Sequence, residues 1–115
     1  YDTGNNFSTV TNAYTCPQDG VYGVAGTTQF SGGGTSDTRQ LFIGDETARN
    51  PGSVGMTDRR VSSSSGEQLT VSGVHNYTTG DTIALWVVNS GSSDSIKGGA
   101  NNFDSSLEIV YLGNP

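Results

Sequence analysis

Short apolar runs alternate with clusters of turn-forming residues along the whole 115-residue chain, and this alternation limits the fold more than any other feature. No run repeats apolar residues at positions i, i+3, i+4 and i+7 without a Gly or a Ser/Thr cluster interrupting it, so helix is nearly excluded. The runs are rich in β-branched and aromatic residues, which favour strands. Seven strands are predicted, at Tyr14–Cys16, Gly20–Phe30, Arg39–Ile43, Arg59–Ser63, Gln68–Tyr77, Thr82–Asn89 and Ser106–Leu112.

Clusters of Gly, Pro, Asn, Asp and Ser separate the predicted strands at 17–20, 31–36, 50–53, 78–81 and 89–95. Strands at this spacing are typical of a sandwich or barrel, so the predicted fold class is all-β. A chain of this length can form one packed core, and we expect a single domain over residues 1–115. No stretch approaches the roughly 20 apolar residues that span a bilayer, so membrane insertion is not expected.

The formal net charge of -6 and a sequence pI near 4.3 limit the classes of partner. The basic residues are Arg39, Arg49, Arg59, Arg60 and Lys97. They cannot form the dense basic stripe that a phosphate backbone needs, so nucleic acid is not expected as a partner. An acid excess with a single Lys fits a halophilic surface, because salt screens the repulsion between like charges.

The last two predicted strands have apolar residues on both faces. In the first, one face carries Ile83, Leu85 and Val87 and the other Ala84, Trp86 and Val88; in the second, Leu107, Ile109 and Tyr111 alternate with Glu108, Val110 and Leu112. A strand of a two-sheet sandwich normally has one polar face. The pattern therefore predicts that a partner subunit covers the second face of both strands.

No catalytic residue is assigned from the sequence. His75 has no neighbouring nucleophile or orienting acid in the sequence, so it is interpreted as a strand or turn histidine. Cys16 is the only cysteine, which permits no internal disulfide, and it is interpreted as a buried core thiol. The acidic residues are scattered among loops and form no paired carboxylates. We therefore expect a protein that is not an enzyme.

No cofactor or metal ligand is assigned either, although a structural calcium stays open as an alternative. Calcium prefers several oxygen ligands, but the sequence has no Asp-x-Asp-x-Asp loop. Five acids lie in or beside predicted turns: Asp37, Asp45, Asp58, Asp94 and Asp104. The motifs at Asn6 and Asn76 match the acceptor pattern for N-glycosylation, a pattern that is frequent by chance in a chain rich in Asn, Ser and Thr.

Four segments in order resemble the globular head of complement component one, subcomponent q, a member of the TNF-like jelly-roll superfamily. The most recognisable is YTCPQDGVY at Tyr14–Tyr22. It is preceded by YDTGNNF at Tyr1–Phe7, which looks like the corresponding stretch of microbial and viral members. GDTIAL at Gly80–Leu85 is similar to a family turn and strand, and NFDSSLEIVY at Asn102–Tyr111 to the closing strand. Together the four segments cover nearly the whole chain.

The resemblance implies a jelly-roll β-sandwich of about ten strands that assembles as a homotrimer, with ligands on outer faces or loops. The family's first strand has no counterpart in this chain before Tyr1, and the chain is shorter than the family between Arg39 and Gln68. Phe103, Tyr111 and Leu112 become candidates for the trimer core. Calcium near a trimer apex is a further family property that the resemblance brings into consideration.

The function expected from these observations is a non-enzymatic trimeric module for attachment, receptor binding and assembly. The leading hypothesis is a virion spike, turret or fibre head on the virion surface or in the extracellular space; the alternative is a cellular secreted, spore-coat or matrix adhesin. Expected partners are further copies of the chain, a host-surface receptor or glycan, and other capsid or fibre proteins. Loops 31–37, 50–57 and 89–99 are the binding candidates. Within and beside them we single out Asp37, Asn50, Thr57, Asn89, Asp94 and Lys97.

Overall fold

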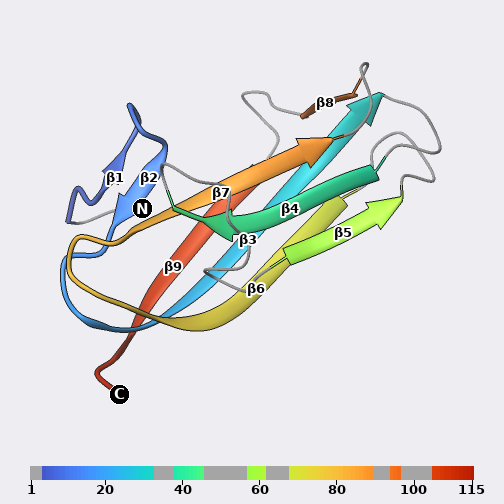
Figure 1. Cartoon of the computed structure of the whole chain (residues 1–115). Coiled ribbons are helices and arrows are strands. Elements are labelled where there is room, and N and C mark those ends of the chain that lie inside the picture. Colours follow the sequence, from blue (N-terminus) through green and yellow to red (C-terminus); the bar gives the residue numbers. More distant parts are fainter. Residues whose placement is uncertain (1–3, 33–37, 46–56, 62–67, 90–93, 97–104) are drawn as a thin grey trace.

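The computed structural model describes residues 4–32, 38–45, 57–61, 68–89, 94–96 and 105–115 (Figure 1). Every regular element in these ranges is a strand, and none of them contains a helix long and apolar enough to cross a membrane. The strands are β1 (Phe7–Ser8), β2 (Ala13–Thr15), β3 (Gly20–Gly32), β4 (Thr38–Gly44), β5 (Thr57–Val61), β6 (Gln68–Tyr77), β7 (Thr82–Asn89), β8 (Asp94–Ile96) and β9 (Ser105–Gly113). The expected all-β class is confirmed.

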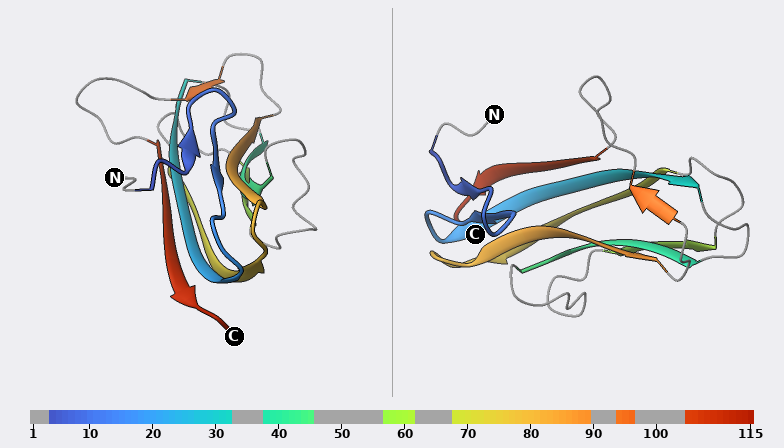
Figure 2. Two further views of the ribbon diagram at one scale, coloured as in Figure 1. Left: turned by 90° about the vertical axis from the view of Figure 1, so that its left-hand side faces the viewer. Right: turned by 90° about the horizontal axis from the view of Figure 1, so that it is seen from above.

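Two antiparallel sheets pack face to face (Figure 2). The first sheet has the strand order β1-β2-β7-β4-β5. In the second sheet β3 is central: it pairs with β6 on one side and β9 on the other, and its last three residues pair with β8. This arrangement is that of a β-sandwich, because each sheet has one face toward the other sheet and one face away from it.

Strand β3 can serve as the long central strand because its side chains alternate strictly in burial. From Gly20 to Phe30 every second residue is buried, including Tyr22, Val24 and Phe30, and the residues that alternate with them are half-buried on the other face. Gly26 occupies one of the inward positions, where a Cβ atom would clash with the Leu85 side chain of β7. The absence of a side chain at this point lets the two sheets approach closely.

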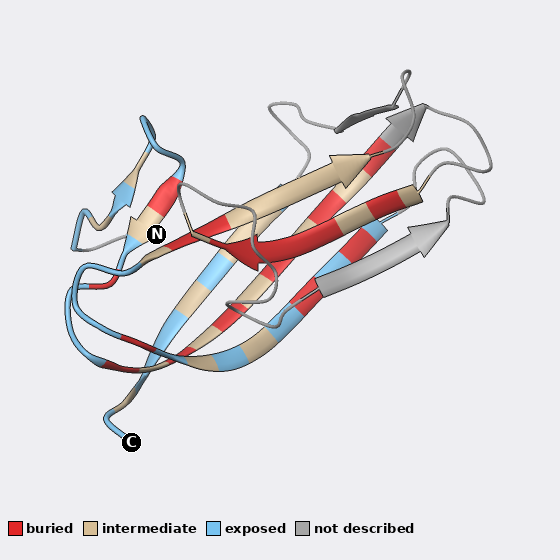
Figure 3. Ribbon diagram, viewed as in Figure 1, coloured by how far each residue is buried: buried red, intermediate tan, exposed pale blue. Residues whose placement is uncertain are grey.

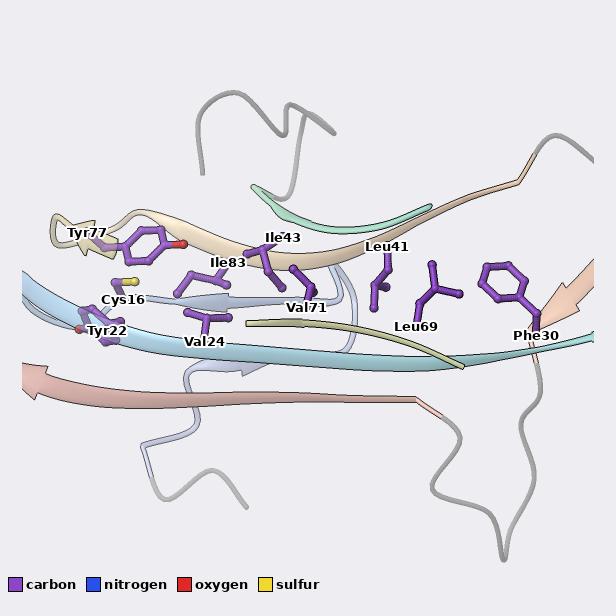
Figure 4. Packing of buried hydrophobic residues seen from close by; sticks show 10 residues of the cluster. All are labelled: Cys16, Tyr22, Val24, Phe30, Leu41, Ile43, Leu69, Val71, Tyr77 and Ile83. Atoms are coloured by element: carbon purple, nitrogen blue, oxygen red, sulfur yellow. The ribbon is translucent and has the colours of Figure 1, made fainter. Parts of the chain in front are cut away.

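The core lies between the sheets and is built from alternate residues of β3, β4, β6 and β7 (Figures 3 and 4). It contains Cys16, Tyr22, Val24, Phe30, Leu41, Ile43, Leu69, Val71, Tyr77 and Ile83. Full burial of one such apolar side chain contributes about 1.5–3 kcal/mol. Half-buried apolar residues pack around the cluster on strands β7 and β9: Leu85, Val87, Leu107 and Ile109. The two residues from each strand share one face, as the alternation in the sequence predicts.

One end of the sandwich is fastened by hydrogen bonds between two turns. The Cys16 amide donates to the Asp81 carbonyl at 2.8 Å, and the Gly80 amide donates to the Cys16 carbonyl at 2.9 Å. The Asp19 carboxylate accepts from both the amide and the hydroxyl of Thr79 at 2.7 Å. Gly80 has a φ of +92°, a left-handed value that favours glycine. The turn predicted at 78–81 is thereby confirmed.

The observed strands agree with most of the predicted ones. Gln68–Tyr77 and Thr82–Asn89 have the predicted bounds, and the strands near residues 14, 20, 39 and 106 differ by one or two residues at their ends. The strand predicted at Arg59–Ser63 begins earlier than expected, since β5 covers Thr57–Val61. The positions after Val61 lie outside the described residues. Strands β1 and β8 were not predicted. The turn predicted over 89–95 was wrong at its end, because β8 begins at Asp94.

Arg39 is completely buried, with its guanidinium carbon 5.0 Å from the centre of the Phe30 ring. It points inward because it alternates in phase with Leu41 and Ile43 along β4. A cation over an aromatic face is attracted by the ring's quadrupole, and this attraction is stronger when water is excluded. A charged residue is therefore part of the core, which the composition did not indicate.

Candidate functional site

The outer face of the five-stranded sheet is covered by the chain itself. Phe42 and Ala84 point away from the core cluster, yet they are only 2% and 4% exposed. Trp86 and Val88 on the same face are half-buried, and the Trp86 indole N–H donates to the Asp45 carbonyl at 2.8 Å. Burial within one chain thus accounts for Phe42 and Ala84 on the second face of this sheet, and the predicted cover of that face of β7 by a partner subunit stays a prediction.

The outer face of the second sheet, here called the β6–β3–β9 face, is open instead. Its side chains come from the positions of β6, β3 and β9 that alternate with the core residues. The central row joins Val74, Gly23 and Val110, which are direct cross-strand partners. Val74 is 65% exposed and Val110 is 58% exposed. Exposed alternation along β6 and β9 is visible in Figure 3.

Leu112 extends the apolar row. It is 56% exposed, and its Cδ1 atom lies 3.6 Å from the position that a Cβ on Gly23 would take. The Leu112 side chain thus leans over the glycine in the middle of the face. The remaining described positions of the face carry Val21, Ala25, Thr27, Gln29, Gln68, Thr70, Ser72, Asn76, Ser106 and Glu108. Glu108 is the only charged residue among them.

Tyr111, a predicted trimer-core residue, is on the opposite side of β9 from Val110. Its ring packs against the Tyr22 ring, with centroids 5.2 Å apart, and its hydroxyl donates to the Asn114 side-chain oxygen at 3.0 Å. Tyr22 in turn contacts Tyr77 edge to face at 5.8 Å. Tyr111 therefore closes one end of the chain's own core while 38% of it stays exposed. Leu112 lies on the open face, and Phe103 lies outside the described residues.

Half of the binding-loop candidates lie outside the part of the chain that the structure describes. This applies to Asp37, Asn50 and Lys97. Thr57 is the first residue of β5, and Asp94 is the first residue of β8. Asn89 is the half-buried last residue of β7, so it belongs to the sheet rather than to a loop.

The surroundings of Cys16 and His75 agree with the interpretation of Cys16 as a buried core thiol and of His75 as a strand histidine. Cys16 is 1% exposed, and burial, assisted by the nearby Asp81 carboxylate, raises its thiol pKa to about 11. Such a thiol stays protonated at neutral pH and is a poor nucleophile. His75 packs edge-on against Tyr77 with ring centroids 5.0 Å apart. Among the described residues, no carboxylate or nucleophile is hydrogen-bonded to it.

The acidic calcium candidates and the N-glycosylation motifs do not come together into one site within the described ranges. No three His, Cys, Asp or Glu side chains there gather in a way that could hold a metal ion. Of the calcium candidates, Asp45 is half-buried, Asp58 and Asp94 begin or lie in strands, and Asp37 and Asp104 lie outside the described residues. Asn76 is exposed at the end of β6, whereas Asn6 is half-buried and its carbonyl accepts from the Thr15 amide.

Val74 was not predicted as a site residue from the sequence, and Val110 was not distinguished there from its neighbours on the same strand. The position of Val74 along β6 was the available signal. Val74 is out of step with the core residues Leu69, Val71 and Tyr77, so its apolar side chain is on the face away from the core.

A comparison of the chain with models of known protein families and with curated proteins finds no match.

Proposed function

We propose that this chain is a non-enzymatic surface-display module of the TNF-like jelly-roll type, which assembles as a homotrimer and presents its loops to a receptor. In its most specific form the module is a virion spike, turret or fibre head that acts outside the cell. Its partners are then a host-surface receptor or glycan and other capsid or fibre proteins. The alternative is a cellular secreted, spore-coat or matrix adhesin of the same fold. Support for the fold comes from the two-sheet sandwich and from the resemblance at Tyr14–Tyr22.

The observation that carries the proposal is the exposed apolar row of the β6–β3–β9 face. Val74, Val110 and Leu112 are each more than half exposed and lie together across three strands. Contiguous exposed apolar residues on a sheet mark an interaction site more often than isolated ones do. The face also contains Gly23 at its centre, so a neighbouring backbone or side chain can approach the sheet closely.

Charge favours a further copy of the chain as the occupant. The chain carries a net charge of -6, yet Glu108 is the only acid on the described β6–β3–β9 face. Two acidic chains repel each other least where neither presents carboxylates. A nearly neutral apolar face on an acidic protein is therefore the surface on which its copies can meet.

The size of the face limits the strength of the contact. Three strands of about nine residues cover about 30 Å by about 14 Å, or roughly 400 Å². Stable interfaces bury about 800 Å² per partner. In a trimer each copy contacts two neighbours, so the apolar row is the centre of a larger contact region, and residues 1–115 alone should associate weakly.

Sedimentation velocity between about 10 µM and about 1 mM, which brackets micromolar to millimolar affinity, tests the proposal. The expected limiting species is a trimer of the 11.9 kDa chain. Val110→Asp should remove association without lowering Tm, because the residue is exposed and three carboxylates would meet at the contact. Val10→Asp is the matched control, since Val10 is 90% exposed on the β1–β2 hairpin, away from the face. A wild-type chain that is monomeric at 1 mM, or equal association of both variants, contradicts the proposal.

The receptor-binding part of the proposal is tested separately on a glycan array and on host cells. Replacement of residues 90–93 and 97–99 by Gly-Ser segments, which leaves β7 and β8 intact, should abolish attachment while Tm is unchanged. Replacement of 33–37 and of 50–56, outside β3 and β5, provides the comparison loops. Attachment that survives all three replacements contradicts a loop-borne receptor site and leaves an assembly module.

A further inference from the structure

Two acceptor motifs for N-linked glycans occur in the chain, and the structure places them in different surroundings. They are Asn6-Phe7-Ser8 and Asn76-Tyr77-Thr78. An N-linked glycan is attached to the side-chain nitrogen of Asn and is bulky and hydrophilic, so the folded protein must leave space beside that nitrogen. The surroundings of the two nitrogens therefore separate a usable acceptor from a match that arises by chance.

The first motif leaves no such space. Asn6 is half-buried, and its side chain packs against Gly4, where a Cβ atom would clash with the Asn6 side-chain nitrogen. The Asn6 carbonyl accepts from the Thr15 amide at 2.8 Å, which holds this segment beside β2. The hydroxyl oxygen of Ser8, the third residue of the motif, accepts from two backbone amides of the following turn. A sugar on the Asn6 nitrogen would have to displace the Gly4 backbone, so the fold opposes a glycan at this position.

The second motif presents its nitrogen to solvent. Asn76 is exposed at the next-to-last position of β6, and it alternates with the buried Tyr77. Its side chain therefore leaves the sheet on the β6–β3–β9 face, away from the core. Its cross-strand partner on this face is Val21 of β3. A glycan on Asn76 can extend into solvent without moving a core side chain.

The other two residues of the second motif are engaged in the folded chain. Tyr77 is 6% exposed, and its ring packs edge to face against the Tyr22 ring. The Thr78 hydroxyl donates to the Asp81 carboxylate at 2.9 Å, and the Thr78 amide donates to the same oxygen at 2.7 Å. A transferase that reads the Asn together with the hydroxyl of the third residue needs this segment released from such contacts. Transfer to Asn76 therefore has to precede the closure of β6 and of the turn after it.

We infer that Asn76, and not Asn6, is the acceptor of an N-linked glycan, and that the modified chain cannot associate through the β6–β3–β9 face. In the transfer, the Asn76 side-chain nitrogen forms a bond to C1 of the first sugar and loses one proton to solvent. The bond from C1 to the pyrophosphate oxygen of a lipid-linked oligosaccharide breaks at the same time. The lipid pyrophosphate leaves with the bonding electron pair, and nothing is oxidised or reduced.

The glycan would lie beside the exposed apolar row of this face. Asn76 and Val74 are two positions apart on the same face of β6, or about 7 Å, and Val74 is 65% exposed. A hydrophilic chain attached there obstructs the surface on which copies are proposed to meet, so the modified chain should stay monomeric. This effect on assembly rests on the proposed function. The assignment of the acceptor does not depend on it.

Mass spectrometry tests the acceptor. Residues 1–115 are secreted from a eukaryotic host cell behind a cleavable signal, and the glycan is located by peptide mapping. The wild type should carry one glycan, the Asn76→Gln variant none, and the Asn6→Gln variant the same glycan as the wild type. A folded wild-type chain without a glycan, or with its glycan at Asn6, overturns the inference.

The order of transfer and folding is tested with a purified oligosaccharyltransferase and its lipid-linked donor. The folded, unmodified chain should be modified at least about 100-fold more slowly than a peptide of residues 70–84, because the native contacts of Tyr77 and Thr78 must open first. The chain unfolded by heat and then cooled in the presence of the transferase is the matched control and should accept the glycan. Equal rates for the folded chain and the peptide would overturn this order.

Sedimentation velocity tests the effect on assembly. The glycosylated wild type should associate at least about 10-fold more weakly than the unmodified Asn76→Gln variant, while their Tm values agree. The matched control moves the glycan to the β1–β2 hairpin. Adding Thr9→Asn to the Asn76→Gln variant creates a motif there with Val10 and Thr11, and Thr9 is exposed.

The control with the moved glycan should associate as strongly as the Asn76→Gln variant. Equal association of all three proteins would overturn the effect on assembly. An unmodified Asn76→Gln variant that is monomeric at about 1 mM would overturn that effect together with the proposed function. The acceptor assignment would then still be decided by the mass of the secreted chain, so failure of one claim is distinguishable from failure of the other.

Discussion

The two sheets carry similar apolar residues on their outer faces but bury them to very different extents. Phe42 and Ala84 on the five-stranded sheet are almost completely buried, whereas Val74 and Val110 on the β6–β3–β9 face are more than half exposed. A strand with two apolar faces therefore has two explanations, cover by its own chain or cover by a partner. Alternation in sequence cannot separate them, because the covering residues are distant along the chain.

The largest expected effect comes from placing the same charge on each outer face. Ala84→Asp should destabilise the fold by about 3 kcal/mol, because it buries a carboxylate without a partner. Ala25→Asp on the open face should cost no more than about 1 kcal/mol, chiefly from repulsion by Glu108, its cross-strand partner. Urea denaturation of both variants at low protein concentration measures the difference. Equal costs would mean that the two faces are equally accessible to water.

A smaller effect concerns the turns that fasten one end of both sheets. Hydrogen bonds from the Thr79 amide, and then from its hydroxyl, hold the Asp19 pKa below its ordinary value. The stabilisation is therefore present above the unfolded-state pKa and is lost as pH falls through the lower folded-state pKa. Asp19→Asn should lower Tm near pH 6 and have progressively less effect toward pH 2. A difference in Tm that is constant with pH would show that the ionised carboxylate is not responsible.

The smallest expected effect is that of salt on the two kinds of surface. Raising NaCl from 0.1 M to 1 M shortens the Debye length from about 10 Å to about 3 Å, which weakens repulsion within a chain of charge -6. Tm should rise, and self-association through the β6–β3–β9 face should strengthen more steeply, because repulsion between chains is also screened. A flat Tm and a constant association constant would argue against a halophilic surface.

The strands and much of the core could be predicted because local patterns determine them. β6 and β7 have the predicted bounds, since each alternates cleanly and the residues 78–81 between them form a turn. Cys16 is buried as expected. Strand β1 could not be predicted, because two residues are too short to show a period, and its pairing with β2 fixes it.

The candidate site was only partly predictable. Leu112 was singled out and is on the open face, but Tyr111 belongs to the aromatic cluster at the end of the chain's own core. A β-bulge between Val21 and Tyr22 shifts the register there, and no local pattern in β9 marks it. Val74 was missed because the prediction considered the last two strands alone. Its importance depends on Gly23 and Val110, which only the register places beside it.

The pairing of β9 with β3 also determines when this protein can finish folding during its synthesis. The Thr28 and Ser105 hydroxyls, 77 positions apart in the chain, are 2.8 Å apart in the fold. A ribosome must therefore release the chain as far as β9 before the second sheet can close, while β3 and β6 remain a two-stranded ribbon with an open apolar side. Such distant pairing is slow, on the order of milliseconds to seconds. The newly made chain would be vulnerable to aggregation and proteolysis in that interval, so a cell that produces it has reason to shield the segment from Gly20 to Gly32.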